Sequence, residues 1–596
     1  MIPLLGRHLR WLALLCASLF CTTSFVLWLP TPSALAANGN NTNVIIMIGD
    51  GMGWEMARAA AIARGTPMYE SGKGSGLSFQ NLSGYTFATT YGTTIPGADG
   101  VYSTGNSALD NSNLETGQSP VRPGFSFNPL PFNPGTTPTG GSTSGGNLVG
   151  YDPQRGGPNP WTPISPTQAA ANGFDKEYIK FSYPDSANTA TTLYTGVKTY
   201  NNAIAVDVFE RDLVTIRQIA AEQGKSTGLV TSVPIDHATP GAAEATVNRR
   251  SKYDNDFPAL DNILQEALRI YQPTVLLGGG HPLDFENESN VGPVYQYTYI
   301  KESTYNELSS KPNNNRYGYT FLERGPDAAQ KLLDTARGVE PESGDRLLGL
   351  YGARGQNGNL PTSSANGDYS NTGLDNFSVF STQGQNPDTV RPLSPGETDA
   401  QFIAREVAEN PTLKDLTNAA LEVLSKDKDG FWLMVEGGDI DWAAHDNNID
   451  NLIGTMNDFD KSVQAVIDWI NQNGGWQKNV LIVTADHDHY LTLNDNFPQL
   501  LAQKGAEALT NEDNPAAAGH FWGSDPNVKY GWGSHTNRIV PVYFQGGKST
   551  ISNYVADGYT AYGFEVPGVS GAVDQVHIFQ AMRDAITGPG RSAVRR

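Results

Sequence analysis

Residues 183–199 read Tyr-Pro-Asp-Ser-Ala-Asn-Thr-Ala-Thr-Thr-Leu-Tyr-Thr-Gly-Val-Lys-Thr, a polar stretch rich in small side chains. Pro184 favours an extended backbone at the residue before it. Ser186 stands where a short helix can begin, and Gly196 stands where that helix would end. A serine at a helix N-terminus faces unpaired N–H groups and the positive end of the helix dipole. Ser186 is therefore either an ordinary N-cap or a nucleophile whose oxygen the helix end stabilises.

The length and charge of the chain narrow the classes of function. With 596 residues the chain can bury a large core, either as one enzyme domain with insertions or as several domains. Its formal net charge of -21 argues against nucleic acid or an anionic membrane as a partner. The negative charge does not exclude anionic substrates, because bound metal ions can make the local electrostatic potential positive.

The N-terminus has the pattern of an export signal. Arg7 and Arg10 precede an apolar run over residues 11–29, and Ala34-Leu35-Ala36 offers a cleavage site. We favour a signal peptide over residues 1–36 and its cleavage, rather than a retained membrane anchor. No twin arginine is present, so a Sec-type route is expected. These features predict a periplasmic or extracellular protein without a stable membrane anchor.

Both cysteines, Cys16 and Cys21, lie in this N-terminal segment. The exported chain would therefore contain no disulfide and no thiolate ligand. Any metal site must be built from His, Asp, Glu and hydroxyl groups.

The rest of the chain alternates short apolar runs with helical patterns. The runs that we expect to be strands are 44–48, 226–232, 274–277, 431–435 and 479–483. This alternation predicts an α/β fold with a central, mostly parallel β-sheet flanked by helices on both faces. Residues 37–596 would form one catalytic domain, with loop-rich insertions at about 93–168 and 285–400.

Metal-binding side chains follow several of these runs. Asp50, Glu436 and Asp486-His487 come at strand ends, where open α/β sheets place ligands. Asp441 and His445 are four residues apart, so a helix would place both on one face. For each residue the ordinary alternative is a turn aspartate or a lone core histidine. Several such pieces together favour zinc bound by nitrogen and oxygen, and a harder ion such as Mg²⁺.

Six motifs occur in order along the chain. They are Ile48-Gly-Asp-Gly-Met-Gly53, Tyr183-Pro-Asp-Ser-Ala with Thr195-Gly-Val-Lys-Thr-Tyr200, His237-Ala-Thr-Pro240, Val435-Glu-Gly-Gly-Asp-Ile-Asp441 with His445, Thr484-Ala-Asp-His487 and Gly533-Ser-His-Thr536. With these motifs the chain resembles the alkaline phosphatase family, over about residues 43–587.

The resemblance implies a role for each matching residue. Ser186 would be the nucleophile that becomes phosphoserine, Arg250 would hold the phosphate, and Asp185 would orient that arginine. The resemblance also implies two Zn²⁺ ions and one Mg²⁺ ion. One zinc would be held by Asp50, Ser186, Asp486 and His487. The other would be held by Asp441, His445 and His535, and the magnesium by Asp50, Thr239 and Glu436.

Two positions depart from some well-known bacterial members. His237 stands where those members have aspartate near the magnesium, and Trp442 stands where they have lysine near the phosphate. The departures leave open the magnesium affinity, the metal preference and the rate of phosphate release. Asp488 and His489 receive no role and are interpreted either as neighbours of the metal ligands or as surface residues.

The leading hypothesis is an exported, metal-dependent alkaline phosphatase that hydrolyses small phosphate monoesters. One alternative is a phosphodiesterase of the same superfamily. A sulfatase is disfavoured, because no Cys/Ser-x-Pro-x-Arg motif was found. A third hypothesis, from another class, is an exported metal-binding protein without catalysis. The resemblance further implies a homodimer, although the altered loops could block it.

Overall fold

The structure is a computed structural model that describes residues 41–66, 72–74, 76–96, 102–103, 124–128, 132–133, 144–156, 178–181, 183–254, 261–283, 295–367, 369 and 394–588. The expected signal peptide, both cysteines and much of the expected insertion at 93–168 lie outside these residues. The chain from Asn41 onward forms one compact unit. Within the described part, no helix combines the length and apolar character needed to cross a membrane.

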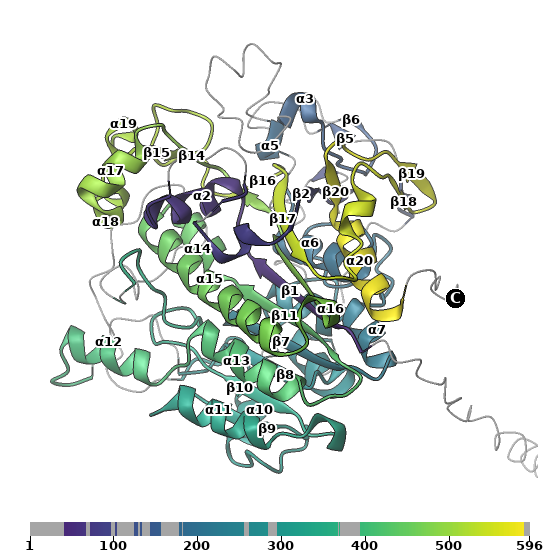
Figure 1. The fold of residues 1–596 in the computed structure, drawn as a ribbon, viewed down its shortest axis with the longest axis vertical. Coiled ribbons are helices and arrows are strands. Elements are labelled where there is room, and N and C mark those ends of the chain that lie inside the picture. The colour runs from purple at the N-terminus through teal and green to yellow at the C-terminus, as the bar shows by residue number, and fades with distance from the viewer. Residues whose placement is uncertain are drawn as a thin grey trace, which may run out of the picture. The chain divides into compact units, whose positions relative to one another are not determined.

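A ten-stranded sheet forms the centre of this unit (Figure 1). All of its strands run parallel except β17, which is antiparallel to both of its neighbours. This arrangement confirms the predicted α/β fold with a mostly parallel sheet. The strands in spatial order are β20 (Ala572–Asp574), β2 (Gly84–Thr89), β17 (Val540–Gln545), β12 (Asn479–Ala485), β1 (Asn43–Gly49), β11 (Phe431–Gly437), β7 (Ser226–Pro234), β8 (Val275–Gly279), β10 (Leu347–Leu350) and β9 (Thr320–Glu323).

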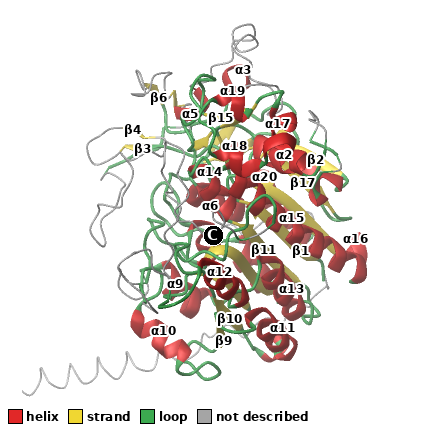
Figure 2. Ribbon diagram, turned by 90° about the vertical axis from the view of Figure 1, so that its left-hand side faces the viewer, coloured by secondary structure: helices red, strands yellow, loops and turns green. Residues whose placement is uncertain are grey.

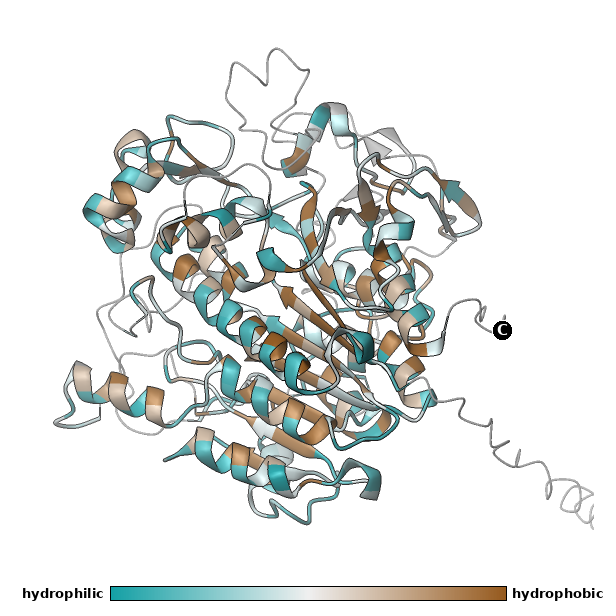
Figure 3. Ribbon diagram, in the orientation of Figure 1, coloured by the Kyte–Doolittle hydropathy of each residue, from teal (hydrophilic) through white to brown (hydrophobic). Residues whose placement is uncertain are grey.

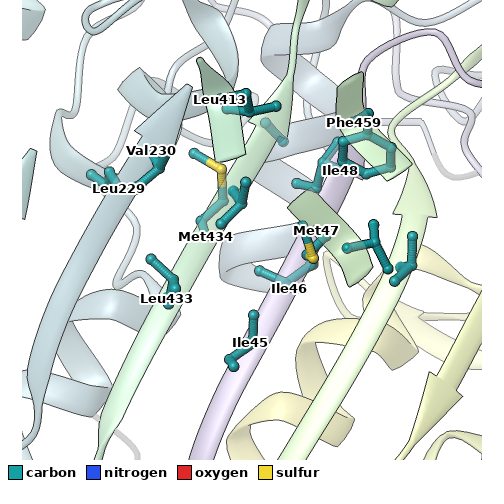
Figure 4. Close-up of a cluster of buried hydrophobic side chains, with 14 of the residues drawn as sticks. Ile45, Ile46, Met47, Ile48, Leu229, Val230, Leu413, Leu433, Met434 and Phe459 are labelled. Carbon is teal, nitrogen blue, oxygen red and sulfur yellow. The ribbon is translucent and has the colours of Figure 1, made fainter. Parts of the chain in front are cut away.

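Strand β1 lies inside the sheet because its sequence is apolar on both faces. The side chains of Val44 to Ile48 are fully buried, as expected for a strand covered on two sides. Figure 4 shows four of them, Ile45 to Ile48, beside apolar side chains of β7 and β11. Figure 3 shows the same apolar band along the central strands.

Helices cover both faces of the sheet, as consecutive residues of β11 demonstrate. Phe431 packs against Trp469 of α15, with ring centroids 5.5 Å apart. The next residue, Trp432, packs edge-on against Tyr194 of α6 at 5.9 Å. Because adjacent strand residues point to opposite faces, α15 and α6 cover opposite sides (Figure 2). Alternate side chains of β11 are thus covered by helices on opposite faces of the sheet.

The remaining elements are helices, of which α15 is 24 residues long, and two-stranded ribbons around this sheet. The helices are α2 (Trp54–Ala63), α3 (Pro153–Gly156), α5 (Tyr178–Phe181), α6 (Ser186–Thr195), α7 (Ile216–Glu222), α8 (Ala238–Glu244), α9 (Ile263–Glu266), α10 (Glu302–Ser309), α11 (Ala328–Gly338), α12 (Asp399–Ala408), α13 (Leu413–Leu424), α14 (Asp439–His445), α15 (Ile449–Gln472), α16 (Gly475–Lys478), α17 (Phe497–Lys504), α18 (Ala506–Thr510), α19 (Pro515–Ala518) and α20 (Gln575–Thr587). The single-turn elements are η1 (Ser78–Asn81), η3 (Ala267–Tyr271), η4 (Pro341–Ser343) and η5 (Ile551–Tyr554). The ribbons are β3 (Ile95–Pro96) with β4 (Tyr102–Ser103), β5 (Phe132–Asn133) with β6 (Ser144–Gly145), β13 (Asp488–His489) with β16 (His535–Thr536), β14 (Leu491–Leu493) with β15 (His520–Trp522), and β18 (Tyr559–Ala561) with β19 (Phe564–Val566).

The region expected as an insertion at about 285–400 contributes to the central sheet. Strand β10 pairs in parallel with β8 on one side and with β9 on the other. Both strands are only four residues long, too short for a clear period-two pattern. They extend the sheet beyond the strands that the sequence predicts.

The register of the parallel strands brings the metal-binding side chains together. Ile48 of β1 pairs with Glu436 of β11, and Gly49 pairs with Ala485 of β12. Asp50 and Asp486 are the next residues along their strands, so three carboxylates emerge at one edge of the sheet.

Candidate active site

Helix α6 begins at Ser186, but its N-cap is Asp185. The Asp185 backbone is extended, and its carboxylate accepts a hydrogen bond from the N–H of Asn188 at 3.0 Å. The interpretation of Ser186 as the N-cap is therefore wrong by one residue. The helix ends at Gly196 in the left-handed conformation, as predicted. Because Asp185 caps the helix, the Ser186 hydroxyl is not used for capping and faces the strand ends.

Asp185 also holds Arg250. Its second carboxylate oxygen lies 3.1 Å from Arg250 Nη1 and accepts a hydrogen bond from the N–H of Asn202 at 3.0 Å. The Arg250 side chain is 20% exposed, so its guanidinium is held in place yet accessible. Burial lowers the pKa of Arg250, but Asp185 and the other acidic neighbours outweigh burial and raise it. Arg250 is thus a fixed cation beside the start of α6.

The Ser186 oxygen lies among residues from two strand ends. It is 3.3 Å from Asp50 Oδ1 and 3.1 Å from His487 Nε2. His487 Nε2 in turn lies 3.3 Å from both Asp50 Oδ1 and Asp486 Oδ2. Asp486 Oδ1 accepts a hydrogen bond from the N–H of Gly51 at 2.9 Å. The structure therefore brings together the four residues expected to share one zinc.

A second group centres on Asp441 of α14. Asp441 Oδ1 lies 3.1 Å from His535 Nε2 and 3.4 Å from His445 Nε2. Those two imidazole nitrogens are 3.0 Å apart. His487 Nε2 lies 4.0 Å from the same Asp441 oxygen, so the two groups adjoin. The three residues expected to hold the other zinc are therefore adjacent.

His489 belongs to this second group, although the sequence interpretation gave it no role. It is fully buried, and its Nε2 lies 2.6 Å from Asp441 Oδ1 while its Nδ1 contacts the carbonyl oxygen of Gly533 at 2.9 Å. Its ligand atom groups with those of Asp441, His445 and His535. The spacing of His487 and His489 was the available signal, because alternate residues of an extended segment point to one side.

Oxygen atoms dominate the third group, around Glu436. The Thr239 hydroxyl donates to Asp50 Oδ2 at 3.4 Å, and the Thr231 hydroxyl donates to Glu436 Oε2 at 2.5 Å. Glu436 also interacts with Thr239 and Asp50. Its other oxygen, Oε1, is buried without a hydrogen-bond partner. Asp50, Thr239 and Glu436 therefore offer an oxygen-rich set with an unsatisfied acceptor.

The charge balance at these strand ends favours a cation. Burial, with Asp441 and Glu436 nearby, raises the pKa of Asp50 well above its usual range. Burial raises the pKa of Glu436 to about 7. Burial, together with Asp50, raises the pKa of Asp486 to about 8. Each shift reports the free-energy cost of holding adjacent carboxylates out of water, and a bound cation offsets that cost.

Three of the four imidazoles have the protonation state that metal ligands need. The exception is His489, because burial lowers its pKa but the hydrogen bond to Asp441 outweighs burial and raises it. Burial lowers the pKa of His445 and His487, and burial together with His487 lowers that of His535 to about 4. Burial raises the pKa of Asp441, but His445, His489 and His535 outweigh burial and bring it well below the usual range. Neutral imidazoles around an ionised carboxylate match the donors of a zinc site. The converging donors and the unsatisfied Glu436 oxygen therefore fit divalent metal ions.

Two glycines after β1 let β13 pack against this segment. Gly51 has a positive φ of 65°, and a Cβ there would lie 2.5 Å from the His489 ring. A Cβ on Gly53 would lie 1.5 Å from Asp488 Oδ1. Any side chain at either position would displace β13. The glycines thus admit the side chains of His489 and Asp488, which agrees with the interpretation of these residues as neighbours of the metal ligands rather than as surface residues.

His237 and Trp442 lie beside each other at the edge of the site. Their ring centroids are 5.9 Å apart. Burial and the positive charge of Arg250 lower the pKa of His237 to about 3, so its imidazole is neutral. Its Nδ1 is buried without a hydrogen-bond partner. The two departures from the bacterial pattern therefore form one contact rather than two separate changes.

Comparison with known proteins agrees with the motifs. The family model for alkaline phosphatase matches residues 166–539, more than half of the chain, so the chain belongs to the alkaline phosphatase family. It is 29% identical over 304 residues to alkaline phosphatase 3 of Bacillus subtilis, covering 51% of this chain and 48% of that protein. It is 27% identical over 417 residues to the alkaline phosphatase of Escherichia coli, covering 67% of this chain and 74% of that protein. The matches to the two Bacillus subtilis relatives thus span about half of their length.

Among solved structures, the fold is similar to that of a cold-active alkaline phosphatase from Shewanella sp. The TM-score is 0.49 at 21% identity, and the match covers 91% of this chain and 99% of that chain.

Proposed function

We propose that this protein is a metal-dependent phosphatase that hydrolyses phosphate monoesters to an alcohol and inorganic phosphate. One observation carries the proposal. The Ser186 hydroxyl, at the start of a helix, faces Asp50 and His487, while Arg250 is held nearby by Asp185. A nucleophile, buried metal donors and an anchored guanidinium are the parts that phosphoryl transfer requires. A protein that only stored metal would need neither the serine nor the arginine.

Each residue then has a defined task. Arg250 binds two phosphoryl oxygens through its forked N–H groups, and Asp185 fixes the orientation of that fork. Ser186 Oγ gives up its proton and attacks phosphorus in line with the departing oxygen. The bond from phosphorus to that oxygen breaks, the alkoxide takes up a proton and leaves as the alcohol, and phosphoserine remains. Water then attacks the phosphoserine and releases phosphate, which restores the Ser186 hydroxyl. The first N–H groups of α6 favour negative charge beside this oxygen throughout.

The metals proposed are two Zn²⁺ ions and one Mg²⁺ ion. The zinc ligands would be Asp50, Ser186, Asp486 and His487 for one ion and Asp441, His445 and His535 for the other. Asp50, Thr239 and Glu436 would hold the magnesium. When bound, these ions supply Lewis-acid stabilisation of the serine oxygen, the leaving oxygen and the phosphoryl charge. His489 would orient Asp441 through its 2.6 Å contact.

The test combines metal analysis with a substrate panel. We expect the purified protein to contain zinc and magnesium, to hydrolyse p-nitrophenyl phosphate at alkaline pH, and to lose this activity to a chelator. Rates on bis-p-nitrophenyl phosphate should be much lower than rates on the monoester. A faster diester reaction would instead assign a phosphodiesterase, and bound zinc with no ester hydrolysed would assign a binding protein.

The proposed location and domain organisation rest on the sequence alone. Residues 1–36 would be removed during export, and residues 37–596 would form one catalytic domain that acts in the periplasm or outside the cell. N-terminal sequencing of the protein recovered from a cell fraction tests both points. A mature chain that starts near Asn38 supports them, and an intact Met1 terminus contradicts them.

A further inference from the structure

Two half-buried aromatic residues, Tyr183 and Trp532, lie close to His535. The Tyr183 ring lies edge-on to the His535 imidazole, with centroids 5.8 Å apart, and lies 5.7 Å from the Trp532 ring. Tyr183 and Trp532 are both half-buried, so neither residue is fully enclosed by the protein. Each comes from a segment that also carries a reacting or metal-binding group. Tyr183 is three residues before Ser186, and Trp532 is three residues before His535.

Specific contacts hold these rings in place. Trp532 Nε1 donates a hydrogen bond to the carbonyl oxygen of His535 at 2.9 Å. His535 Nδ1 contacts the carbonyl oxygen of Pro184, the residue after Tyr183, at 2.9 Å. The Lys180 ammonium lies 5.4 Å from the centroid of the Trp532 ring, within the range of a cation–π interaction. The aromatic pair is therefore pre-organised, which lowers the entropy cost of binding another ring.

The position of Tyr183 and Trp532 determines which part of a bound substrate they would contact. Ser186 Oγ contacts Asp50 and His487, whereas His535 belongs to the adjoining group around Asp441. In an in-line displacement the leaving oxygen departs from the side of phosphorus opposite the nucleophile. The alcohol part of the substrate would thus lie beside His535 and next to Tyr183 and Trp532. This placement rests on the function proposed above.

We propose that Tyr183 and Trp532 form a subsite for a planar aromatic leaving group, such as an aryl ring or a nucleobase. Aromatic pairs prefer offset-stacked or edge-to-face arrangements, and the tilted Tyr183–Trp532 pair offers both a face and an edge. Stacking tolerates many ring types, because each ring presents a π face. The subsite would favour aromatic phosphate monoesters over aliphatic ones of similar charge.

Equilibrium binding to a chain that cannot turn over separates this subsite from catalysis. In a metal-loaded Ser186→Ala protein, we would measure affinities for phenyl phosphate, AMP, glycerol phosphate and inorganic phosphate by calorimetry. We expect an added Trp532→Ala change to weaken binding of at least one aromatic ester about five- to tenfold. Affinity for glycerol phosphate and inorganic phosphate should change much less. The ester that loses affinity identifies the source of the ring, aryl or nucleobase.

Conservative and remote variants complete the test. Trp532→Phe keeps a ring and should keep most of the preference, and Tyr183→Leu tests the same subsite from the other segment. Tyr295→Ala removes an aromatic side chain that is 46% exposed and packs near His281 and Tyr305, so it should change no affinity. Equal losses for all four ligands, or no loss for either aromatic ester in both subsite variants, would overturn the proposal.

The two proposals fail in distinguishable ways. If the wild-type chain binds aromatic esters through Trp532 but hydrolyses no monoester, the phosphatase assignment fails and the subsite stands. If it hydrolyses monoesters with no dependence on Tyr183 or Trp532, the subsite fails and the phosphatase assignment stands.

Discussion

The carboxylate of Asp488, in β13, accepts a 2.6 Å hydrogen bond from the hydroxyl of Thr536, in β16. The same oxygen lies 3.5 Å from Arg538 Nε, and the other oxygen packs against Gly53. Asp488 is fully buried. It therefore ties together the segments after β1, after β12 and before β17, each of which carries proposed metal ligands.

Replacing Asp488 by alanine should loosen this arrangement. The change leaves the Arg538 guanidinium buried without its acidic partner, which costs about 3 kcal/mol of the free energy of unfolding. Urea denaturation checks the stability, and elemental analysis after dialysis checks metal retention, which should fall. Asp488→Asn keeps an acceptor for Thr536 and should lose less of both. An alanine variant with wild-type stability and metal content would contradict the role of Asp488.

Replacing Ser186 by alanine should nearly abolish turnover while leaving the free energy of unfolding almost unchanged. Turnover of p-nitrophenyl phosphate should fall about a thousandfold or more, because no nucleophile remains. The free energy of unfolding should change by about 0.5 kcal/mol or less, because Asp185 still caps α6. Steady-state kinetics and thermal melts of the same preparation measure the two effects. Wild-type turnover with full metal content would refute the nucleophile assignment.

Variants at Asp185 should separate its role as the N-cap of α6 from its ion pair with Arg250. Asn is as good an N-cap as Asp, so Asp185→Asn should keep the stability of α6 but lose the charge that faces Arg250. Asp185→Ala loses the cap as well and should be less stable by about 1 kcal/mol. Both variants should weaken inhibition by inorganic phosphate, measured as a higher inhibition constant. Unchanged inhibition in both would show that Arg250 does not need Asp185.

Glu266, which lies outside the candidate active site, should make the free energy of unfolding depend on pH. Burial raises the pKa of Glu266 to about 7, although it accepts a 2.8 Å hydrogen bond from the Thr246 N–H. An unfolded glutamate has a pKa of about 4.3, so between these values the folded state binds more protons than the unfolded state. Stability contributed by this group is complete below about pH 4.3 and is lost as the pH rises through about 7.

The Glu266→Gln variant should not show this loss of stability as the pH rises. We expect its stability relative to wild type to grow by roughly 2 kcal/mol between pH 5.5 and pH 8, measured by urea denaturation. Glu302→Gln, at an exposed position of α10, should show no such trend. Parallel pH profiles for Glu266→Gln and wild type would contradict the prediction.

The sequence predicts the centre of the fold better than its edge. The run Val44 to Ile48 is apolar at every position, and only a strand buried on both faces accommodates that pattern. Strands β9 and β10 are too short to show such a pattern, and their pairing depends on neighbours distant in sequence. The interpretation of residues 285–400 as an insertion therefore overlooked two strands of the central sheet.

Motif spacing located the residues of the candidate site but not their individual environments. Asp50, Asp441, His487 and His535 come together because parallel strands end at one edge of the sheet. The N-cap was misplaced because aspartate and serine both cap helices well, and only the backbone at Asp185 distinguishes them. His489 was given no role because its spacing from His487 is informative only where the segment is extended, and because its contact with Asp441 joins segments distant in sequence.

The position of β1 in the sheet has a consequence for synthesis of the chain. This strand is the first of the sheet to leave the ribosome, yet its neighbours are β11 and β12, which end at Gly437 and Ala485. The segment Val44 to Ile48 must therefore remain unpaired until most of the polypeptide has been made. A nascent chain of this topology pairs its first central strand late, so an apolar segment of the kind that aggregates stays unpaired for most of synthesis.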